Sequence, residues 1–255
     1  MTLILLPPSE SKTARRRGRP VDTGSLSFPA LTATRRTVLE ALAKVSETPD
    51  AYDVLGVGPS FAAEVERNTR WTTEPAVPVA GLYSGVLYDA LSYATLSAGA
   101  KRRASNRLVV MSAAWGALRM TDRVPPYRLS GSASLPGVGP VAGAWREVLD
   151  PELSAAAGTG LIVDCRSSTY AAMWRPAGPL ADRWVSVAVV REQDGRRTVV
   201  SHMAKHTRGL VVRHLLESGT DPRTPERLRA LVADDWNAEL TRARSGWTLT
   251  VVERD

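Results

Sequence analysis

The sequence predicts one domain of the mixed α/β (α+β) class, with a mixed central sheet surrounded by helices. Segments that favour strands and segments that favour helices follow one another without the strict β–α–β alternation of an all-parallel fold. No internal repeat and no low-complexity linker divides the 255 residues, and a chain of this length can bury a large core. We therefore predict a single domain over residues 1–255, with residues 31–71 forming a helical insertion.

The first predicted strand is the apolar run at residues 3–6, which Pro7 and Pro8 end. This run is too short for a signal peptide or a membrane span, so we interpret it as a buried strand. The chain has a single cysteine, Cys165, and hence no internal disulfide, which fits a reducing compartment. The sequence thus predicts a cytoplasmic protein with no membrane partner.

Basic residues give the chain a formal net charge of +7, a balance that favours polyanionic partners. Only four of the 33 basic side chains are lysines, and the others are arginines. An ammonium and a guanidinium are not interchangeable at a binding site, so each remaining lysine is a candidate functional residue. Two of the four, Lys12 and Lys205, fall inside motifs described below.

A basic segment follows the first strand. Residues 11–20 carry one lysine and four arginines, with no acidic residue among them. Two interpretations stay open for this segment: a solvated, mobile loop, or a flexible arm that contacts phosphates.

The next segment predicts a helix followed by a glycine hairpin. Residues 31–45 place Leu39, Leu42 and Val45 at helical spacing. Residues 55–62 then read hydrophobic–Gly–hydrophobic–Gly, three further residues and alanine, the pattern of the hairpin in a helix-hairpin-helix unit. Pro59 suits the start of the following helix, where a missing N–H costs nothing.

This hairpin predicts a phosphate site. Gly56 and Gly58 permit positive φ and a close approach of the backbone to a ligand. The following helix presents unpaired N–H groups and the positive end of its dipole, which suit a phosphate oxygen. Gly56, Val57, Gly58 and Ser60 are therefore candidate contacts to a sugar-phosphate backbone, and such contacts read no base sequence. The alternative is a plain tight turn, because acidic residues lie nearby.

A second glycine pair, at residues 135–140, has the same hairpin sequence pattern, but the residues before it do not favour a helix. A hairpin of this kind needs two helices to hold it, so we predict a loop there. Residues 82–91 are predicted to end another loop and to begin a helix.

Polar residues gather just beyond the predicted strand ends. Residues 107–112 and 161–164 are short, continuously apolar runs that predict two further strands. Ligand crevices in open sheets form outside such ends. The residues concerned are Lys12, Ser112, Asp164, Ser168, Tyr170, Lys205 and Arg208. Each one alone fits an ordinary loop or capping role, whereas the set favours a site for a phosphate, a nucleotide or a nucleic-acid backbone.

The C-terminal part predicts a hairpin, a helix and a last strand. Residues 185–190 and 197–203 form the hairpin around a turn at residues 193–195. Residues 204–217 predict an amphipathic helix, and residues 247–253 predict the strand.

The sequence predicts no metal site and no bound cofactor. His202 and His206 have the i, i+4 spacing of a metal pair, but His202 falls on the predicted strand and no glutamate lies between them. Cys165 next to Arg166 fits either a redox thiol of lowered pKa or a structural cysteine, and we favour the structural one. The chain contains no P-loop, no Gly-x-Ser-x-Gly elbow and no dinucleotide fingerprint.

Six sets of motifs follow one another along nearly the whole chain. They are Leu26-Ser27-Phe28-Pro29, Leu82-Tyr83-Ser84-Gly85-Val86-Leu87-Tyr88, Met111-Ser112-Ala113-Ala114-Trp115-Gly116-Ala117-Leu118-Arg119, Pro126-Tyr127-Arg128-Leu129, Ile162-Val163-Asp164 with Ser168-Thr169-Tyr170, and Ala204-Lys205-His206-Thr207-Arg208-Gly209-Leu210. In order and spacing they resemble the YaaA family of bacterial peroxide-stress proteins. The family's Ser-Pro-Ala-Lys run corresponds here to residues 8–12, which match at Lys12 only with a short insertion. Asp164 stands where many relatives have asparagine, and His206 replaces one of two adjacent lysines.

The resemblance implies a mixed α/β fold with a positively charged cleft and a helix-hairpin-helix element. It also implies binding of double- and single-stranded DNA and a role in limiting iron-driven oxidative DNA damage, with no settled catalytic activity. Phosphate contacts are then expected from Gly56, Val57, Gly58, Ser60, Lys12, Arg128, Ser168, Lys205 and Arg208.

Two other hypotheses compete with DNA binding. The first is an enzyme that acts on a nucleotide or nucleobase in a pocket lined by Lys12, Ser112, Tyr170, Lys205 and Arg208. Asp164 is a further catalytic candidate in that case. The second is a thiol sensor built on Cys165. A deep pocket that holds both motif lysines favours the enzyme, whereas an open basic groove continuous with the hairpin favours DNA.

Overall fold

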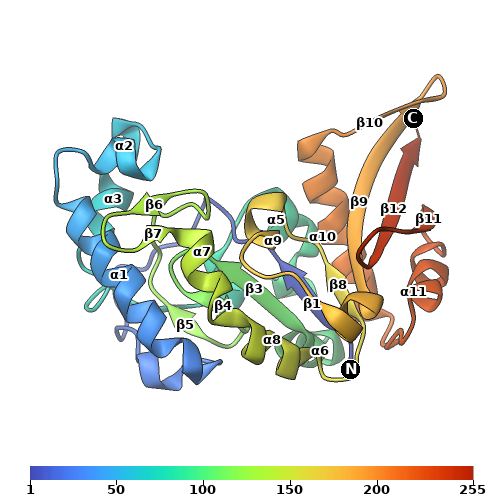
Figure 1. The fold of residues 1–255 in the computed structure, drawn as a ribbon, viewed down its shortest axis with the longest axis horizontal. Coiled ribbons are helices and arrows are strands. Elements are labelled where there is room, and N and C mark those ends of the chain that lie inside the picture. The colour runs from blue at the N-terminus through green and yellow to red at the C-terminus, as the bar shows by residue number, and fades with distance from the viewer. Residues whose placement is uncertain (255) are drawn as a thin grey trace.

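The computed structural model describes residues 1–254, which form a mixed α/β domain around an eight-stranded sheet (Figure 1). The strand order is β11-β12-β9-β8-β1-β3-β4, and β10 pairs with β9 outside this path. The parallel part of the sheet consists of β1 (Leu3–Leu6), β3 (Leu108–Ser112), β8 (Ile162–Asp164), β9 (Trp184–Gln193) and β12 (Trp247–Arg254). Antiparallel neighbours are β4 (Gly116–Leu118), β10 (Arg196–Thr198) and β11 (Asn237–Arg242). The predicted fold class is confirmed.

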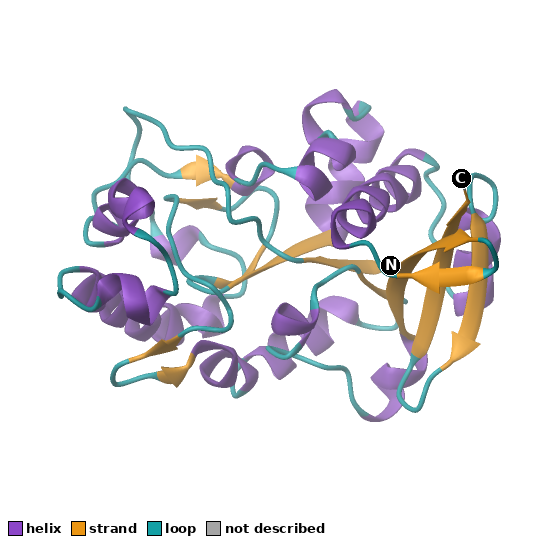
Figure 2. Cartoon of the chain, turned by 90° about the horizontal axis from the view of Figure 1, so that it is seen from above, coloured by secondary structure: helices purple, strands orange, loops and turns teal. Residues whose placement is uncertain are grey.

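Helices lie on both sides of the parallel strands (Figure 2). They are α1 (Thr32–Ser46), α2 (Ala51–Leu55), α3 (Ala62–Asn68), α4 (Val79–Leu82), α5 (Val86–Leu91), α6 (Ala98–Arg107), α7 (Val141–Arg146), α8 (Leu149–Ala157), α9 (Ser168–Ala171), α10 (Ser201–Glu217) and α11 (Pro225–Val232). Short 3-10 helices occupy Thr23–Ser25, Pro29–Leu31, Pro59–Phe61, Tyr93–Thr95 and Gly178–Arg183. Two small sheets complete the fold, β2 (Val77–Pro78) with β5 (Arg123–Val124) and β6 (Ser134–Leu135) with β7 (Gly139–Pro140). Within residues 1–254, no helix has both the length and the apolar character that a membrane span requires.

Strand β1 lies between β8 and β3 and is buried along its whole length. Its register places Leu5 beside Val109 of β3 on one edge and beside Asp164 of β8 on the other. A parallel strand covered on both faces needs a continuous apolar run, which is what residues 3–6 provide. The three buried strands predicted from such runs are confirmed.

A buried arginine anchors α1, the helix predicted at residues 31–45. The Nε of Arg35 donates to the carbonyl oxygen of Trp115 (3.0 Å), and Nη2 donates to those of Ser27 (2.7 Å) and Ala117 (2.9 Å). Burial lowers the pKa of Arg35 to about 10, against the opposing effect of Asp122. An arginine that the sequence pattern does not distinguish thus holds α1 against the turn after β3.

The glycine hairpin differs from the prediction. The helix before it is α2, only five residues long, and not the helix at residues 31–45. Gly56 has φ +62° and ends α2 in the left-handed region, whereas Gly58 has φ −89°, which any residue can adopt. The segment is therefore a short helix, a tight turn and a second short helix, and a helix-hairpin-helix element is not confirmed.

The second glycine pair forms the β6–β7 hairpin, with Gly137 at φ +77° and Gly139 at φ +79°. As predicted, no helix precedes it within residues 123–135. The predicted loop is thus a turn held by strand pairing.

The predicted strand at residues 197–203 is wrong beyond its first two residues. Strand β10 ends at Thr198, and α10 begins at Ser201, so His202 and Met203 lie in the first turn of a helix. Val199 and Val200, whose β-branched side chains suggested a strand, are 73% and 39% exposed and lie between β10 and α10. The predicted strand at residues 247–253 is confirmed as β12, which extends to residue 254.

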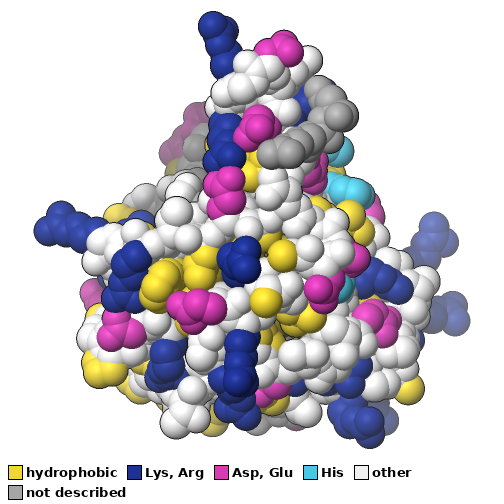
Figure 3. Space-filling view, turned by 90° about the vertical axis from the view of Figure 1, so that its right-hand side faces the viewer, with side chains coloured by type: hydrophobic (Ala, Val, Ile, Leu, Met, Phe, Trp, Pro, Cys, Tyr) yellow, Lys and Arg dark blue, Asp and Glu magenta, His cyan; other side chains and the backbone are white. Residues whose placement is uncertain are grey.

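The end of the molecule that carries β9, β12 and α11 has a surface of mixed charge. Figure 3 views this end, and basic and acidic side chains are interspersed across it. One example is the ion pair between Arg197 and Glu239, whose Nη2 and Oε1 atoms are 2.7 Å apart. The described side chains of this face therefore do not form the single-sign field that steers a polyanion.

Helix α10 packs against α5 around Gly209. A Cβ atom at this position would lie 2.3 Å from the carbonyl oxygen of Leu87 and 2.8 Å from the Cβ of Ala90. Only glycine permits so close an approach of the two helices, and α10 carries Lys205 and Arg208 of the predicted site.

We expect Gly209→Ala to lower the free energy of unfolding by roughly 1–3 kcal/mol, because α10 must move away from α5. Gly143→Ala in α7 is the matched control, since its Cβ would meet only the Cβ of Pro140, at 3.9 Å. Urea denaturation followed by circular dichroism measures both variants. A Gly209→Ala protein as stable as the wild type would contradict the proposed close contact.

Candidate functional site

The carboxyl ends of β1 and β8 meet at the point where the chain changes direction along the sheet, since β3 lies on one side of β1 and β8 on the other. Ligand crevices form at such switch points. Here the segments that follow β1 and β8 line a pocket of about 430 Å³, together with the start of α5. A volume of this size falls in the range of roughly 300–1,000 Å³ that small-ligand sites occupy.

Two cationic side chains of α10 face this pocket. Lys205 is exposed, and Arg208 is held in place because its Nε donates to the carbonyl oxygen of Val187 (2.9 Å). Tyr170 lines the pocket from α9, and its hydroxyl accepts a hydrogen bond from the amide of Gly131 (3.4 Å). Tyr170, Lys205 and Arg208 of the predicted set are therefore brought together.

Hydroxyl groups complete the wall of this pocket. Ser167 and Thr169, on either side of the predicted Ser168, are among the lining residues, together with Ser9, Ser11 and Ser130. None of these five was predicted from the sequence, and the predicted Ser168 does not line the pocket. The available signal was the runs Pro8-Ser9-Glu10-Ser11 and Ser167-Ser168-Thr169 beside two strand ends.

Lys12 lies in a smaller, adjoining hollow of about 170 Å³. Its Nζ donates to the carbonyl oxygens of Ser9 (2.7 Å) and Glu10 (3.3 Å) and lies 4.3 Å from the centre of the Tyr127 ring. Burial lowers the pKa of Lys12 to about 8; Glu10 opposes this shift and Arg128 adds to it.

A third hollow, of about 540 Å³, joins this region to the glycine hairpin. It is lined by Gly56 and Val57 on one side and by Arg128 and Ser130 on the other. Glu10 lines all three hollows, so they adjoin one another along the carboxyl edge of the sheet. We call these three adjoining hollows the strand-end groove.

The hairpin amides serve the protein itself at two of the predicted positions. The amide of Gly56 donates to the carbonyl oxygen of Asp53 (3.2 Å), and that of Val57 donates to Tyr52 (2.9 Å), which closes the end of α2. The amides of Gly58 and Ser60 are the other two predicted contacts of this turn, but neither residue lines the three hollows.

Ser112 and Asp164 lie inside the protein and do not line the groove. The hydroxyl of Ser112 donates to Tyr127 (2.7 Å) and accepts from the amide of Trp115 (3.1 Å). Asp164 forms an ion pair with Arg166 (2.7 Å). Burial alone would raise the pKa of Asp164, but the charge and hydrogen bonds of Arg166 hold it below its usual value. Both residues therefore have a structural role at the buried ends of β3 and β8.

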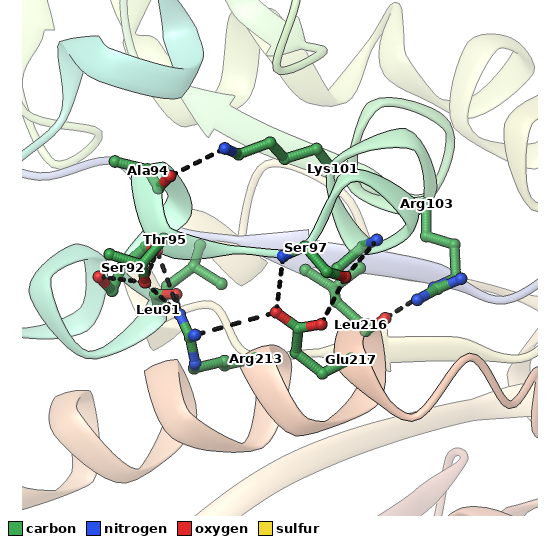
Figure 4. A network of polar contacts seen from close by, with 11 residues as sticks. Leu91, Ser92, Ala94, Thr95, Ser97, Lys101, Arg103, Arg213, Leu216 and Glu217 are labelled. Carbon is green, nitrogen blue, oxygen red and sulfur yellow. Dashed lines mark hydrogen bonds and ion pairs between the residues drawn. The ribbon is translucent and has the colours of Figure 1, made fainter.

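The position of α10 is fixed by polar contacts at its far end (Figure 4). Glu217 accepts hydrogen bonds from the amide (2.9 Å) and hydroxyl (2.7 Å) of Ser97, at the start of α6. Arg213 donates to the carbonyl oxygen of Leu91 (3.1 Å), and Arg103 donates to that of Leu216 (2.6 Å). These contacts tie α10 to α5 and α6, and so fix the helix that presents Lys205 and Arg208.

The basic segment at residues 11–20 is anchored at both ends. The amide of Thr13 donates to Leu82 (2.8 Å), and the carbonyl oxygen of Arg19 accepts from Ala76 (2.9 Å). Its four arginines are exposed. The segment is thus a tethered loop that starts in the groove at Lys12.

Cys165 lines the pocket of about 430 Å³, yet its side chain is buried. Burial raises the pKa of the thiol to about 12, although the charge of Arg208 opposes the shift. A thiol of this pKa is protonated at neutral pH and is a poor nucleophile, which argues against the thiol-sensor hypothesis.

His202 and His206 both lie on α10 and are exposed. The prediction that placed His202 on a strand, and so argued against a histidine pair, is therefore wrong. Among residues 1–254, no cluster of three or more histidine, cysteine, aspartate or glutamate side chains could hold a metal ion.

Fold and groove together define a mixed α/β protein with three adjoining hollows at the carboxyl edge of its parallel strands. The family model of the peroxide stress protein YaaA matches residues 2–241, nearly the whole chain. The chain belongs to this family, as its motifs indicated.

Three relatives match most of the chain. A UPF0246 protein of Streptomyces coelicolor is 45% identical over 256 residues, which cover 98% of each chain. A UPF0246 protein of Corynebacterium glutamicum is 40% identical over 233 residues, or 90% of this chain and 91% of the relative. One of Laribacter hongkongensis is 28% identical over 241 residues, or 88% and 92%.

The burial of Cys165 gives a direct prediction. In the native protein at pH 8, the thiol should react with a disulfide reagent far more slowly than in guanidinium, because it is both shielded and protonated. Absorbance of the released thiolate measures the two rates, and the unfolded chain should yield one thiol, the number in the sequence. Equal rates in the two states would return Cys165 to the list of reactive thiols.

Proposed function

We propose that the protein is a cytoplasmic DNA-binding protein of the peroxide response that holds DNA by its phosphates in the strand-end groove. The observation that carries the proposal is the continuity of the three hollows. Through their shared residue Glu10, they place the glycine hairpin and the cations of α10 along one concave surface. This continuity is what an open DNA-binding groove requires and a closed catalytic pocket does not.

The charges along the groove support a polyanionic ligand. Five cationic side chains line it, against three carboxylates. Glu10 and Arg128 pair with each other (3.2 Å), and Arg67 pairs with Glu74 (3.0 Å). Lys12, Lys205 and Arg208 are the remaining cations, against the carboxylates of Asp53 and Glu64. The exposed arginines of residues 15–19 extend the positive surface from Lys12 outward. Phosphate contacts of this kind fix the position of a double- or single-stranded nucleic acid without reading its sequence.

An enzyme that acts on a nucleotide or nucleobase is the second candidate. The pocket of about 430 Å³ favours it, because Lys205, Arg208 and several hydroxyls suit a nucleotide phosphate. Turnover of a nucleotide by the wild type, detected by mass spectrometry and lost in Lys205→Arg, would select this candidate, because an arginine keeps the charge but cannot give up its proton.

If phosphates dominate binding, duplex affinity should fall linearly with salt on a log–log scale, with little dependence on sequence. Lys205→Ala should reduce the slope by about one phosphate's share (~0.9), whereas Lys205→Arg should keep it. Lys101→Ala, on α6, is the control outside the groove. Gel-shift titrations on random duplexes over a salt series measure the slopes.

Two results would contradict this binding mode. One is a strong preference for a single sequence. The other is a salt slope that Lys205→Ala leaves unchanged.

The left-handed conformation of Gly56 allows the turn itself to be tested. Gly56→Val should cost roughly 1–3 kcal/mol, because a β-branched residue is strained at φ +62°. Gly56→Asn is the matched control, since asparagine tolerates this region and the space around the Cβ is open. Thermal melts and gel shifts on the same samples separate folding from binding. A folded Gly56→Val protein with full DNA affinity would place the turn outside the interface.

A further inference from the structure

Lys12 has surroundings that a simple phosphate contact does not need. A lysine that only neutralises a phosphate extends its ammonium into solvent. The Nζ of Lys12 instead turns back to the carbonyl oxygens of Ser9 and Glu10 and lies against the Tyr127 ring. Its lowered pKa, about 8, leaves a fraction of the amine unprotonated at neutral pH, as a nucleophilic lysine requires.

The hollow around Lys12 selects for a small ligand. Its volume of about 170 Å³ is well below the roughly 300–1,000 Å³ of most ligand pockets, so it suits a sugar but not a whole nucleoside. Phe61, Glu64 and Arg67 line it from the segment that follows the glycine hairpin, and Arg128 lines it from the other side. A DNA strand in the strand-end groove would therefore pass its backbone over this hollow.

A deoxyribose that has lost its base fits these constraints. It enters such a hollow at the lowest cost, because no base has to be unpaired or unstacked. Its ring-opened form carries an aldehyde at C1′, the group with which a lysine amine forms an imine.

We propose that Lys12 is a nucleophile that forms an imine with the C1′ aldehyde of an abasic site in DNA. The proposal rests on the proposed function, since the groove has to hold the DNA strand. It assigns the smaller hollow a substrate class, the base-free deoxyribose.

The chemistry balances without an added oxidant or reductant. The Nζ of Lys12 bonds to C1′, and the adduct loses water to give the imine. A base then removes a proton from C2′, the C3′–O bond breaks, and the 3′ strand leaves with its 5′-phosphate. Water hydrolyses the remaining unsaturated imine and restores the amine of Lys12.

Glu10 and Arg128 are placed to assist these steps. Glu10 lines the hollow and is 59% exposed at its side chain, so its carboxylate can accept the C2′ proton. Arg128, whose Nη1 lies 3.2 Å from Glu10 and whose guanidinium stacks 4.1 Å over the Phe61 ring, is a fixed cation for the departing phosphate.

Borohydride trapping tests the proposal on the full chain. Sodium borohydride reduces the imine to a stable amine, so a duplex with one abasic site should become covalently attached to the protein. Peptide mapping by mass spectrometry should place the adduct on Lys12. The chain offers only three other lysines and its N-terminal amine as alternatives. An adduct on any of these groups instead of Lys12 would overturn the proposal.

Variants separate the chemistry from binding. Lys12→Arg should lose the adduct, whereas the control Lys44→Arg, on α1 and outside the groove, should keep both the adduct and its affinity for intact duplex. Glu10→Gln should still be trapped but should cleave the abasic strand more slowly. Undiminished trapping in a folded Lys12→Arg protein would refute the role of Lys12.

A free sugar distinguishes failure of this proposal from failure of DNA binding. If the wild type binds no duplex, the proposed function fails, and 2-deoxyribose 5-phosphate with sodium cyanoborohydride is used instead. Modification at Lys12 would then support imine formation at the hollow without DNA. No modification of Lys12 by the sugar phosphate or by the abasic duplex would overturn the inference.

Discussion

The fold depends on strand β1 being paired along both edges in the centre of a parallel sheet. Its four residues are at most 1% exposed, so every backbone donor and acceptor needs a partner from β3 or β8, more than 100 residues away in sequence. Once these pairings form, the chain after each strand emerges at the same edge. The groove is therefore a consequence of sheet topology, and its lining comes from segments far apart in sequence.

Two buried arginines hold the elements on either side of this edge. Arg35 joins α1 to the turn after β3, and Arg166 joins the end of β8 to the carbonyl oxygens of Tyr170 (3.2 Å) and Trp174 (2.9 Å). Burying such charges brings little net stability, but removing one partner of a buried pair costs roughly 3–5 kcal/mol. These arginines thus restrict the chain to one arrangement more than they stabilise it.

The sequence was most informative where local pattern alone decides structure. Continuous apolar runs predicted β1, β3 and β8, and helical spacing predicted α1. The start of α10 was missed because Val199 and Val200 favour strands locally while no neighbouring strand is available to pair with them. The short helix α2 was missed because a single turn carries no periodic signal.

The candidate site was predictable in part, and for a physical reason. Residues directly after a strand share its edge, so Lys12 and Tyr170 could be grouped in advance. Lys205 and Arg208 were grouped with them on the basis of a predicted strand at residues 197–203, where the helix α10 in fact begins at Ser201. The environment of Lys12 could not be predicted from the sequence, because it depends on the Tyr83 and Tyr127 rings, which contact Lys12 only through tertiary packing. Glu10, which joins the three hollows, differs in sequence from any other exposed glutamate only by its place after β1.

The burial of Cys165 has a counterpart in the methionines. Met111, Met120 and Met173 are at most 1% exposed, so most of the sulfur in the chain is sealed inside the core. Peroxide attacks accessible thiolates and thioethers first, and oxidised methionine disrupts the packing around it. A protein of a peroxide-stress family is thereby built with few oxidisable atoms in reach of solvent. Its core packing is shielded from the oxidation of these sulfur atoms.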